Sequence, residues 1–215
     1  MKLQITLKAQ LKKLISATKI CKVCFKDIDF GTDLYICDKC FNELDCIYEE
    51  SKIKNISVLC IYRYDKTFAN LLYRFKGCFD YELRDVFLSR QKSYLKIKYF
   101  NYILIPIPSW KEDDDTRGFN HVEEIFKSLK LPIVKCLRKK EKFKQSSLMK
   151  IERQNIKRKL EIVNGDIINN KKILIIDDVM TTGSTIKAAI DLLSKHNPKD
   201  IKILILSRKC RKNKK

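Results

Sequence analysis

The segment over residues 173–185 constrains the fold more than any other part of the chain. It reads Ile173-Leu-Ile-Ile-Asp177-Asp178-Val-Met-Thr-Thr-Gly-Ser-Thr185, an apolar run that ends at two adjacent carboxylates and a turn. A second apolar run covers residues 201–206, and a helical pattern over residues 184–196 separates the two. Continuous apolar strands that alternate with helices are typical of a parallel sheet. We therefore predict an α/β fold whose parallel sheet has helices on both faces.

The composition narrows the class of protein. The chain has 215 residues and is 45% hydrophobic, which is enough for a core. It has no apolar run near the roughly 18 residues of a membrane helix, and residues 1–17 lack the features of a secretory signal, so we expect a cytoplasmic protein. Lys and Arg number 46 against 26 Asp and Glu, a net charge of +20. This charge favours polyanionic partners such as nucleic acid, although Lys and Ile are abundant throughout and part of the excess is compositional.

The residues after the first apolar run have the chemistry of a sugar-phosphate site. Asp177 and Asp178 stand at the carboxyl end of a strand, where open α/β sheets bind ligands, and carboxylates accept hydrogen bonds from vicinal hydroxyls. The turn that follows offers backbone N–H groups, hydroxyls, a glycine and the positive end of a helix, all suited to phosphate. The turn residues are Thr181, Thr182, Gly183, Ser184 and Thr185. Together they predict a site for ribose 5-phosphate.

An apolar strand before two acids also resembles the Walker B strand of a nucleotide hydrolase. That interpretation requires a GxxxxGK[ST] loop elsewhere in the chain. The chain has five glycines, and none precedes a Lys-Ser/Thr pair at that spacing. We therefore exclude an ATPase of this class.

Four of the nine cysteines form two CxxC pairs, Cys21 with Cys24 and Cys37 with Cys40, with twelve residues between the pairs. Two such turns can bring four thiolates to one point, as a tetrahedral zinc site needs. Without an export signal disulfides are disfavoured, and a thioredoxin-type role would use one CxxC at the head of a helix. We predict a small zinc ribbon or knuckle whose folding depends on the metal. The other five cysteines have no pairing pattern and are interpreted as small apolar residues, including Cys46, although it is near enough in sequence to substitute as a ligand.

The first half of the chain predicts several further elements. Residues 1–19 have the pattern of a basic amphipathic helix, and residues 56–64 that of a strand. A helix begins after Asp65 and ends at Gly77, and another is predicted over residues 81–92. The residues expected on the buried face of the first of these helices are Phe68, Leu71, Leu72 and Phe75.

In the second half, a buried strand is predicted over residues 99–106 and a helix over residues 119–129. Between them we expect a loop that carries the acids of residues 112–115. Short strands are predicted near Ile133 and over residues 160–162.

The motifs together resemble those of a known family. Residues 173–185 look like the PRPP-binding signature of type I phosphoribosyltransferases, and the whole chain resembles the ComF family of competence-associated proteins. The other motifs that carry the resemblance, besides the four cysteines, are Leu71-Leu-Tyr-Arg-Phe-Lys-Gly77, Ile103-Leu-Ile-Pro-Ile-Pro108, Arg117-Gly-Phe-Asn120, and Gln145-Ser-Ser-Leu148 with Glu152-Arg153 and Asn155. The resemblance covers about residues 20–207.

The resemblance implies a type I phosphoribosyltransferase-like domain joined to a small N-terminal zinc unit. The expected division is a basic helix (1–19), the four-cysteine unit (20–47), a connecting or hood region (48–98), the phosphoribosyltransferase-like domain (99–210) and a basic tail (211–215).

The resemblance also implies roles for individual residues. Asp177 and Asp178 would bind the ribose 2- and 3-hydroxyls, and residues 181–185 would hold the 5-phosphate. The loop after Ile105-Pro106 would face pyrophosphate, with Arg117 the nearest guanidinium. A Mg²⁺ ion would bridge pyrophosphate and ribose oxygens, largely through substrate and water. Residues 138–158 would form a basic loop that closes over the site.

One departure from the family concerns the loop before Arg117. That loop is usually rich in arginine, but here it reads Lys111-Glu-Asp-Asp-Asp-Thr116. Either these acids lie beside pyrophosphate and repel it, or they point to solvent.

Of the other conspicuous side chains, His121 and His196 fit no metal-ligand pattern and are expected in surface or packing roles.

Three functions follow as alternatives. The ComF resemblance implies a DNA-handling protein of natural transformation that binds PRPP and single-stranded DNA, with a competence helicase or other uptake machinery as a partner. The lysines expected to contact nucleic acid are Lys139, Lys140, Lys142 and Lys144. The alternatives are a metabolic phosphoribosyltransferase that joins PRPP to a nucleobase or amine, and a PRPP sensor without turnover. No residue is identified as a catalytic acid or base, so enzymatic turnover stays open.

Overall fold

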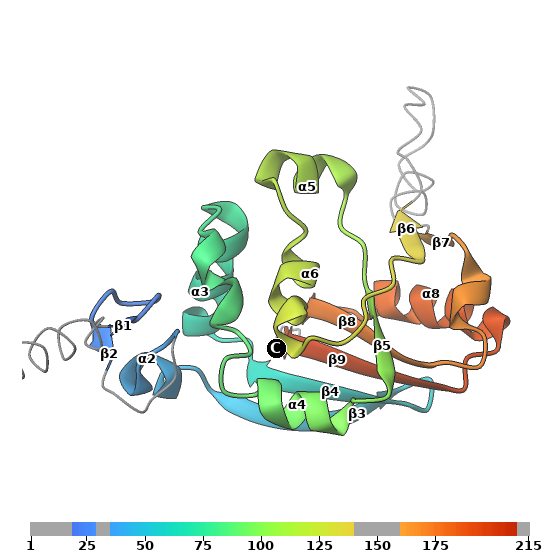
Figure 1. Cartoon of the computed structure of the whole chain (residues 1–215), viewed down its shortest axis with the longest axis horizontal. Helices are drawn as coiled ribbons and strands as arrows, with labels where there is room; N and C mark the ends of the chain where they lie inside the picture. Colours follow the sequence, from blue (N-terminus) through green and yellow to red (C-terminus); the bar gives the residue numbers. More distant parts are fainter. Residues whose placement is uncertain (1–18, 29–34, 140–159, 210–215) are drawn as a thin grey trace, which may run out of the picture.

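The computed structural model describes residues 19–28, 35–139 and 160–209 (Figure 1). Its central sheet has five strands in the order β3 (Cys46–Ile53), β4 (Ile56–Arg63), β9 (Asp200–Arg208), β8 (Lys172–Met180) and β5 (Tyr102–Pro106). The pairs β4–β9, β9–β8 and β8–β5 are parallel, and β3 pairs antiparallel with β4 at one edge. The predicted α/β fold is confirmed, with an antiparallel edge strand added.

The central sheet takes strands from both sides of residue 99, the predicted start of the phosphoribosyltransferase-like domain. β4 lies within residues 48–98 and pairs in parallel with β9. Its run from residue 58 to residue 62 is buried throughout, which suits a strand that is covered on both faces. The hairpin to β3 turns at Lys54 and Asn55, whose φ angles of 49° and 64° are those of a two-residue turn that matches the twist of the strands.

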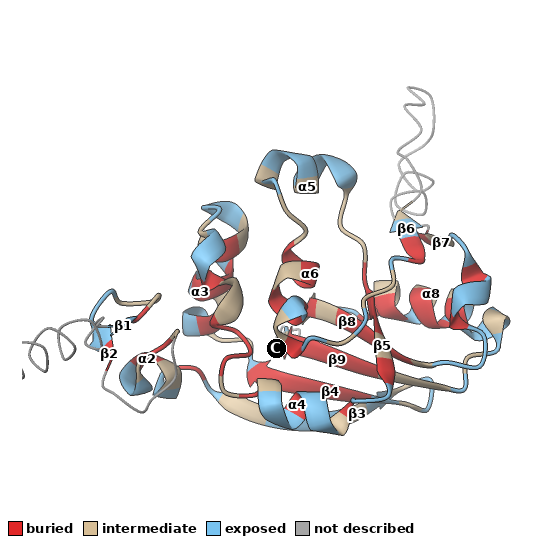
Figure 2. Cartoon of the chain, in the orientation of Figure 1, coloured by how far each residue is buried: buried red, intermediate tan, exposed pale blue. Residues whose placement is uncertain are grey.

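Helices cover both faces of the sheet. They are α3 (Lys66–Gly77), α4 (Lys92–Lys98), α6 (His121–Phe126) and α8 (Ser184–Leu193). Successive side chains of a strand face opposite sides, so β8 supplies both halves of the core. Leu174 and Ile176 pack in one apolar cluster with α3, α4 and α6, whereas Ile173 and Ile175 pack in the other with α8. Figure 2 shows the resulting buried strands, with exposed residues on the outer sides of the helices.

Helix α3 confirms its prediction in detail. The Asp65 side chain caps the helix by accepting a hydrogen bond from the Phe68 N–H at 2.8 Å. The four apolar residues predicted on one face are all buried. The helix ends at Gly77, where an added Cβ would lie 2.7 Å from the ring of Tyr73. A side chain at this position would therefore displace the ring.

Residues 81–92 do not form the single helix predicted for them. A 3₁₀ helix, η1 (Tyr81–Asp85), is followed by turns, and α4 begins only at Lys92. Leu83, Val86 and Phe87 are all completely buried. A surface helix needs a polar face, and this apolar run packs on too many sides to leave one.

The acids of residues 112–115 lie in a helix rather than in the predicted loop. Helix α5 (Lys111–Arg117) carries three of them in its first turn, where the positive end of the helix favours negative charge. Gly118, with φ of 80°, ends the helix in a left-handed conformation. Figure 1 shows α5 at the tip of the connection between β5 and α6, away from the sheet. The prediction of a loop was wrong because it did not use these two features, acids in the first turn and a glycine at the end, which are typical of a helix.

The remaining elements are short. They are β1 (Lys19–Ile20), β2 (Asp27–Ile28), α2 (Asp38–Asn42), β6 (Leu137–Lys139), β7 (Leu160–Ile162) and the 3₁₀ helices η2 (Lys127–Leu129), η3 (Gly165–Ile168) and η4 (Ser194–His196). The strand predicted near Ile133 is a single bridge to Leu104. The predicted basic helix over residues 1–19 and the basic tail lie outside the described residues, Lys19 apart. Among the residues described, no helix is both long and apolar enough to cross a membrane.

Replacing Phe75 with Ala should lower the free energy of unfolding by about 3–5 kcal/mol, because its ring is fully buried against Phe87 and Phe119. Tyr73→Ala on the same helix is the matched control. Its ring is 66% exposed, so the loss should stay below about 1 kcal/mol. Denaturant unfolding measures both variants, and equal losses would contradict the described packing of α3.

Candidate functional site

The four predicted metal ligands come together in space. The Sγ atoms of Cys21, Cys24, Cys37 and Cys40 all lie within 4.8 Å of one another, and those of Cys24 and Cys37 are 3.8 Å apart. Four sulfur ligands at about 2.3 Å from a tetrahedral zinc ion are separated by about 3.8 Å. The cluster therefore fits a single tetrahedral metal ion.

The pKa values of the thiols also favour a bound cation. Burial and the neighbouring cysteines raise the pKa of Cys40. Burial also opposes ionisation of Cys21, but hydrogen bonds, first among them the Cys37 N–H at 3.4 Å, bring the pKa of Cys21 to about 7. Four closely spaced thiols cannot all ionise without a cation among them, and a divalent metal supplies that charge.

The four-cysteine unit is joined to the rest of the protein through α3. Arg74 donates a hydrogen bond from Nη1 to the Val23 carbonyl at 2.9 Å, and its guanidinium lies over the ring of Phe25 at 5.6 Å. Cys21 and Ile36 belong to the same apolar cluster as the face of the sheet that α3 covers. The cysteine unit and the sheet therefore share one core on this side.

Strand β8 carries both of the predicted acids. The apolar run ends at Ile176, but β8 continues to Met180, so Asp177 and Asp178 lie inside the strand. Because successive strand residues face opposite sides, Asp178 points with Ile176 towards α3 and α6. Asp177 points to the side that α8 covers. The adjacent carboxylates thus have different surroundings.

Asp177 lies beside the predicted phosphate turn. It is half-buried and lines a small cleft together with residues 179–186. Gly183, with φ of 69°, precedes the first residue of α8, and the Ser184 N–H donates to the Thr182 hydroxyl at 3.3 Å. The structure thus brings together Asp177, Thr181, Thr182, Gly183, Ser184 and Thr185 at one point. A turn of this kind at the start of a helix presents N–H groups and hydroxyls to an anion.

Asp178 is buried and is held by two basic side chains. Its Oδ2 lies 2.6 Å from Lys76 Nζ of α3 and 3.1 Å from His121 Nε2 of α6. Its Oδ1 accepts a hydrogen bond from the Val179 N–H at 2.6 Å. Only 7% of the side chain is exposed.

These contacts shift the pKa values of the two carboxyl groups in opposite directions. Burial alone would raise the pKa of Asp178, but the hydrogen bond from His121 and the charge of Lys76 hold it well below its usual range. Burial and the charge of Asp178 raise the pKa of Asp177. Asp178 is therefore a fixed anion, and Asp177 is the carboxylate that hydroxyl donors or a cation would stabilise.

The contacts of Lys76 and His121 with Asp178 were missed by the sequence interpretation. His121 was expected in a surface or packing role; it is buried, with 6% exposed, and the contact with Asp178 was not predicted. Both residues lie in or beside motifs that carry the ComF resemblance, which was the available signal. Nothing in the local pattern places them against Asp178, because the three come from different elements of the fold.

The side chain of Arg117 is mostly buried and contacts polar groups of the protein. Its Nε donates to the Lys76 carbonyl at 3.2 Å, and its Nη1 lies 3.0 Å from Asp114 Oδ1 and 3.2 Å from His121 Nδ1. Its side chain is 10% exposed. The role of this guanidinium beside pyrophosphate stays a prediction.

The acids before Arg117 differ in their surroundings. Asp114 turns inward and also accepts hydrogen bonds from Ser109 at 2.5 Å and Asn120 at 2.8 Å. It therefore joins the segments before and after α5. The other three, Glu112, Asp113 and Asp115, are exposed.

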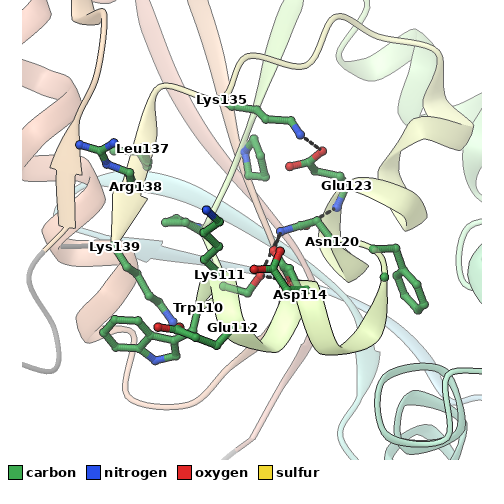
Figure 3. Close-up of a pocket in the computed structure, with 16 residues that line it drawn as sticks. Trp110, Lys111, Glu112, Asp114, Asn120, Glu123, Lys135, Leu137, Arg138 and Lys139 are labelled. Carbon is green, nitrogen blue, oxygen red and sulfur yellow. Dashed lines mark hydrogen bonds and ion pairs between the residues drawn. The ribbon is translucent and has the colours of Figure 1, made fainter. Parts of the chain in front are cut away.

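A cavity of about 900 Å³ lies between this loop and β6 (Figure 3). From the β6 side it is lined by Arg138 and Lys139, and from the side of α5 and α6 by Glu112 and Glu123. It reaches Pro106 of β5, which pairs with the residue of β8 that precedes Asp177. The cavity therefore borders the carboxyl edge of the sheet.

One of the four lysines predicted to contact nucleic acid lies in this cavity. Lys139 Nζ sits 4.7 Å from the centre of the Trp110 ring. Lys140, Lys142 and Lys144 lie outside the described residues, as does most of the loop predicted to close over the site.

Residues 115–215 match the family model described as the phosphoribosyl transferase domain. Among curated proteins, Competence protein ComFC of Streptococcus pneumoniae (strain ATCC BAA-255 / R6) is 35% identical over 153 residues, which are 71% of this chain and 69% of the relative. Competence protein ComFC of Bacillus subtilis (strain 168) is 30% identical over 151 residues, 67% of this chain and 62% of the relative.

A third relative matches locally. Adenine phosphoribosyltransferase of Mycoplasmopsis pulmonis (strain UAB CTIP) is 53% identical over 47 residues, 22% of this chain and 28% of the relative. With the parallel sheet, the four-cysteine cluster and the long matches to the two competence proteins in view, the chain belongs to the ComF family and has a phosphoribosyltransferase-like fold.

Proposed function

We propose that this chain binds PRPP with Mg²⁺ at the end of β8 and uses that site in handling single-stranded DNA or its nucleotides during natural transformation. One observation carries the proposal: the half-buried Asp177 and residues 181–185 line one cleft, at the point where the chain leads into the N-terminus of α8. The setting is supported by the curated relatives, which are named competence proteins.

In this proposal the 5-phosphate of PRPP lies against the turn of residues 181–185. Backbone N–H groups and hydroxyls donate to its oxygens, and the dipole of α8 favours its charge. The Asp177 carboxylate accepts hydrogen bonds from the ribose hydroxyls. Asp178, the second acid that the resemblance assigns to the ribose, is held by Lys76 and His121 at the back of the strand.

Mg²⁺ fits the chemistry of this edge of the sheet. The ion prefers oxygen ligands and keeps several waters, so PRPP itself and water would supply most of its ligands, next to the Asp177 carboxylate. It would neutralise charge on the pyrophosphate, which the resemblance places against the loop after β5.

Single-stranded DNA is the proposed macromolecular partner. The net charge of +20 favours a polyanion, and Lys139 contributes to a basic wall of the cavity beside the site. A competence helicase or other uptake machinery would act with the protein in this setting.

A metabolic phosphoribosyltransferase is the second candidate. The local match to an adenine phosphoribosyltransferase favours it. This function requires release of pyrophosphate from PRPP that depends on one nucleobase or amine. PRPP binding without release for any acceptor would favour a sensor or DNA-handling role over the transferase.

We further propose that the four-cysteine cluster holds a structural zinc ion. Zinc prefers a closed tetrahedral set of thiolates, and the cluster offers four. Because this unit has few residues of its own, the metal would supply much of its folding energy.

Asp177→Asn should weaken binding of Mg²⁺·PRPP by about tenfold or more, because a hydrogen bond to a charged group contributes about 1.5–3 kcal/mol. Isothermal titration calorimetry measures the affinity. Asp166→Asn is the matched control, since this exposed acid precedes the opposite end of β8. Absence of binding by the folded, metal-loaded wild-type protein would contradict the proposed site.

Replacing the four predicted lysines with Gln should weaken binding of an oligodeoxynucleotide. The slope of log affinity against log salt should become shallower by about 3, if each lysine neutralises one phosphate. The replaced residues are Lys139, Lys140, Lys142 and Lys144. A control with the same change in net charge replaces exposed lysines elsewhere, Lys96, Lys171, Lys195 and Lys199. Equal slopes for the two variants would refute a localised DNA contact.

The double variant Cys37→Ser with Cys40→Ser should lose bound zinc, measured by elemental analysis of the purified protein. Cys78→Ser is the control, because this cysteine is exposed and outside the cluster. It should retain one equivalent of metal. A wild-type protein that folds without metal would overturn the assignment.

A further inference from the structure

The histidine beside Asp178 contacts a second charged group through its other nitrogen. His121 Nε2 faces Asp178 Oδ2 at 3.1 Å, and His121 Nδ1 faces Arg117 Nη1 at 3.2 Å. The ring is enclosed, with 7% of its side chain exposed. Its two nitrogens therefore have fixed and different partners.

These partners determine where the ring proton lies. A guanidinium can only donate hydrogen bonds, so Nδ1 must be the acceptor in the contact with Arg117. The proton of the neutral ring is then on Nε2, from which it is donated to the Asp178 carboxylate. A proton on Nδ1 would point at the N–H groups of the guanidinium, donor against donor.

Arg117 is itself fixed in a closed set of contacts. Its Nε donates to the carbonyl of Lys76, whose Nζ binds the same Asp178 oxygen as His121. Asp114 accepts from Nη1 at 3.0 Å and balances the charge of the guanidinium. Lys76, Arg117, His121 and Asp178 thus form a ring of interactions that joins α3, α5, α6 and β8.

We propose that His121 is a positioning residue of the PRPP site, fixed as the Nε2–H tautomer between Arg117 and Asp178 and holding the Asp178 carboxylate in one orientation. Arg117 acts through His121 rather than on pyrophosphate. The backbone N–H of Asp178 in turn donates to Asp177 Oδ1 at 2.9 Å. The residue that His121 holds in place therefore also fixes the carboxylate that faces the cleft. The functional part of this inference rests on the proposed function; the tautomer does not.

The tautomer is tested by nitrogen-15 NMR of the imidazole rings in the full chain without ligand. The chain has two histidines, and His196 serves as the internal reference. At neutral pH, His121 should show a protonated Nε2 and an unprotonated Nδ1. In Arg117→Met the donor to Nδ1 is removed, so the Nδ1 signal should shift towards that of a nitrogen without a hydrogen bond, while Nε2 stays protonated against Asp178 and the His196 signals stay unchanged. A protonated Nδ1 in the wild-type protein would overturn the assignment.

The positioning role is tested by two substitutions of His121. The Gln side chain can donate an amide N–H towards Asp178, so His121→Gln should keep its affinity for Mg²⁺·PRPP within about threefold of wild type. His121→Leu, which has no donor, should lose about tenfold or more. Circular dichroism checks the fold of each variant, and a Leu variant that does not fold is replaced by His121→Met.

The outcomes separate the two proposals. Equal affinity of the wild-type, Gln and donor-free variants would overturn the positioning role, as would equal loss in Gln and donor-free variants that are folded. If the wild-type protein does not bind Mg²⁺·PRPP, the proposed function and the positioning role fail together. The NMR result then still decides the tautomer.

Discussion

The carboxyl edge of the sheet depends on the buried carboxylate of Asp178. A charge at this depth is costly unless it is paired and hydrogen-bonded, and Lys76, His121 and the Val179 N–H together meet that requirement. Each partner comes from a different part of the chain. The carboxylate therefore connects α3 and α6 to β8 at the point where the candidate ligand site begins.

The geometry of a strand explains why two adjacent acids have separate tasks. With a side-chain period of two, Asp178 shares the face of Leu174 and Ile176, and Asp177 shares that of Ile173 and Ile175. One carboxylate stabilises the packing of helices on the sheet, and the other faces the turn into α8. In our account the first holds the second in place for a ribose.

Local patterns in the sequence were sufficient for much of the fold. The apolar runs predicted the central strands, the face of α3 was predicted residue by residue, and the CxxC spacing predicted the sulfur cluster. The predictions failed where tertiary contacts decide the outcome. The apolar residues after Tyr81 pack on several sides instead of forming a helix face, and the contacts of Lys76 and His121 with Asp178 span distant parts of the chain.

The proposed function depends on the turn of residues 181–185, which would hold the 5-phosphate of PRPP. The most direct measurement is the change in backbone amide NMR signals when Mg²⁺·PRPP is added, with ribose 5-phosphate as a second ligand. Both ligands should shift the amides of Thr181, Gly183 and Thr185, and PRPP should also shift signals in the loop after β5. Unchanged amides in this turn at saturating ligand would contradict the claim.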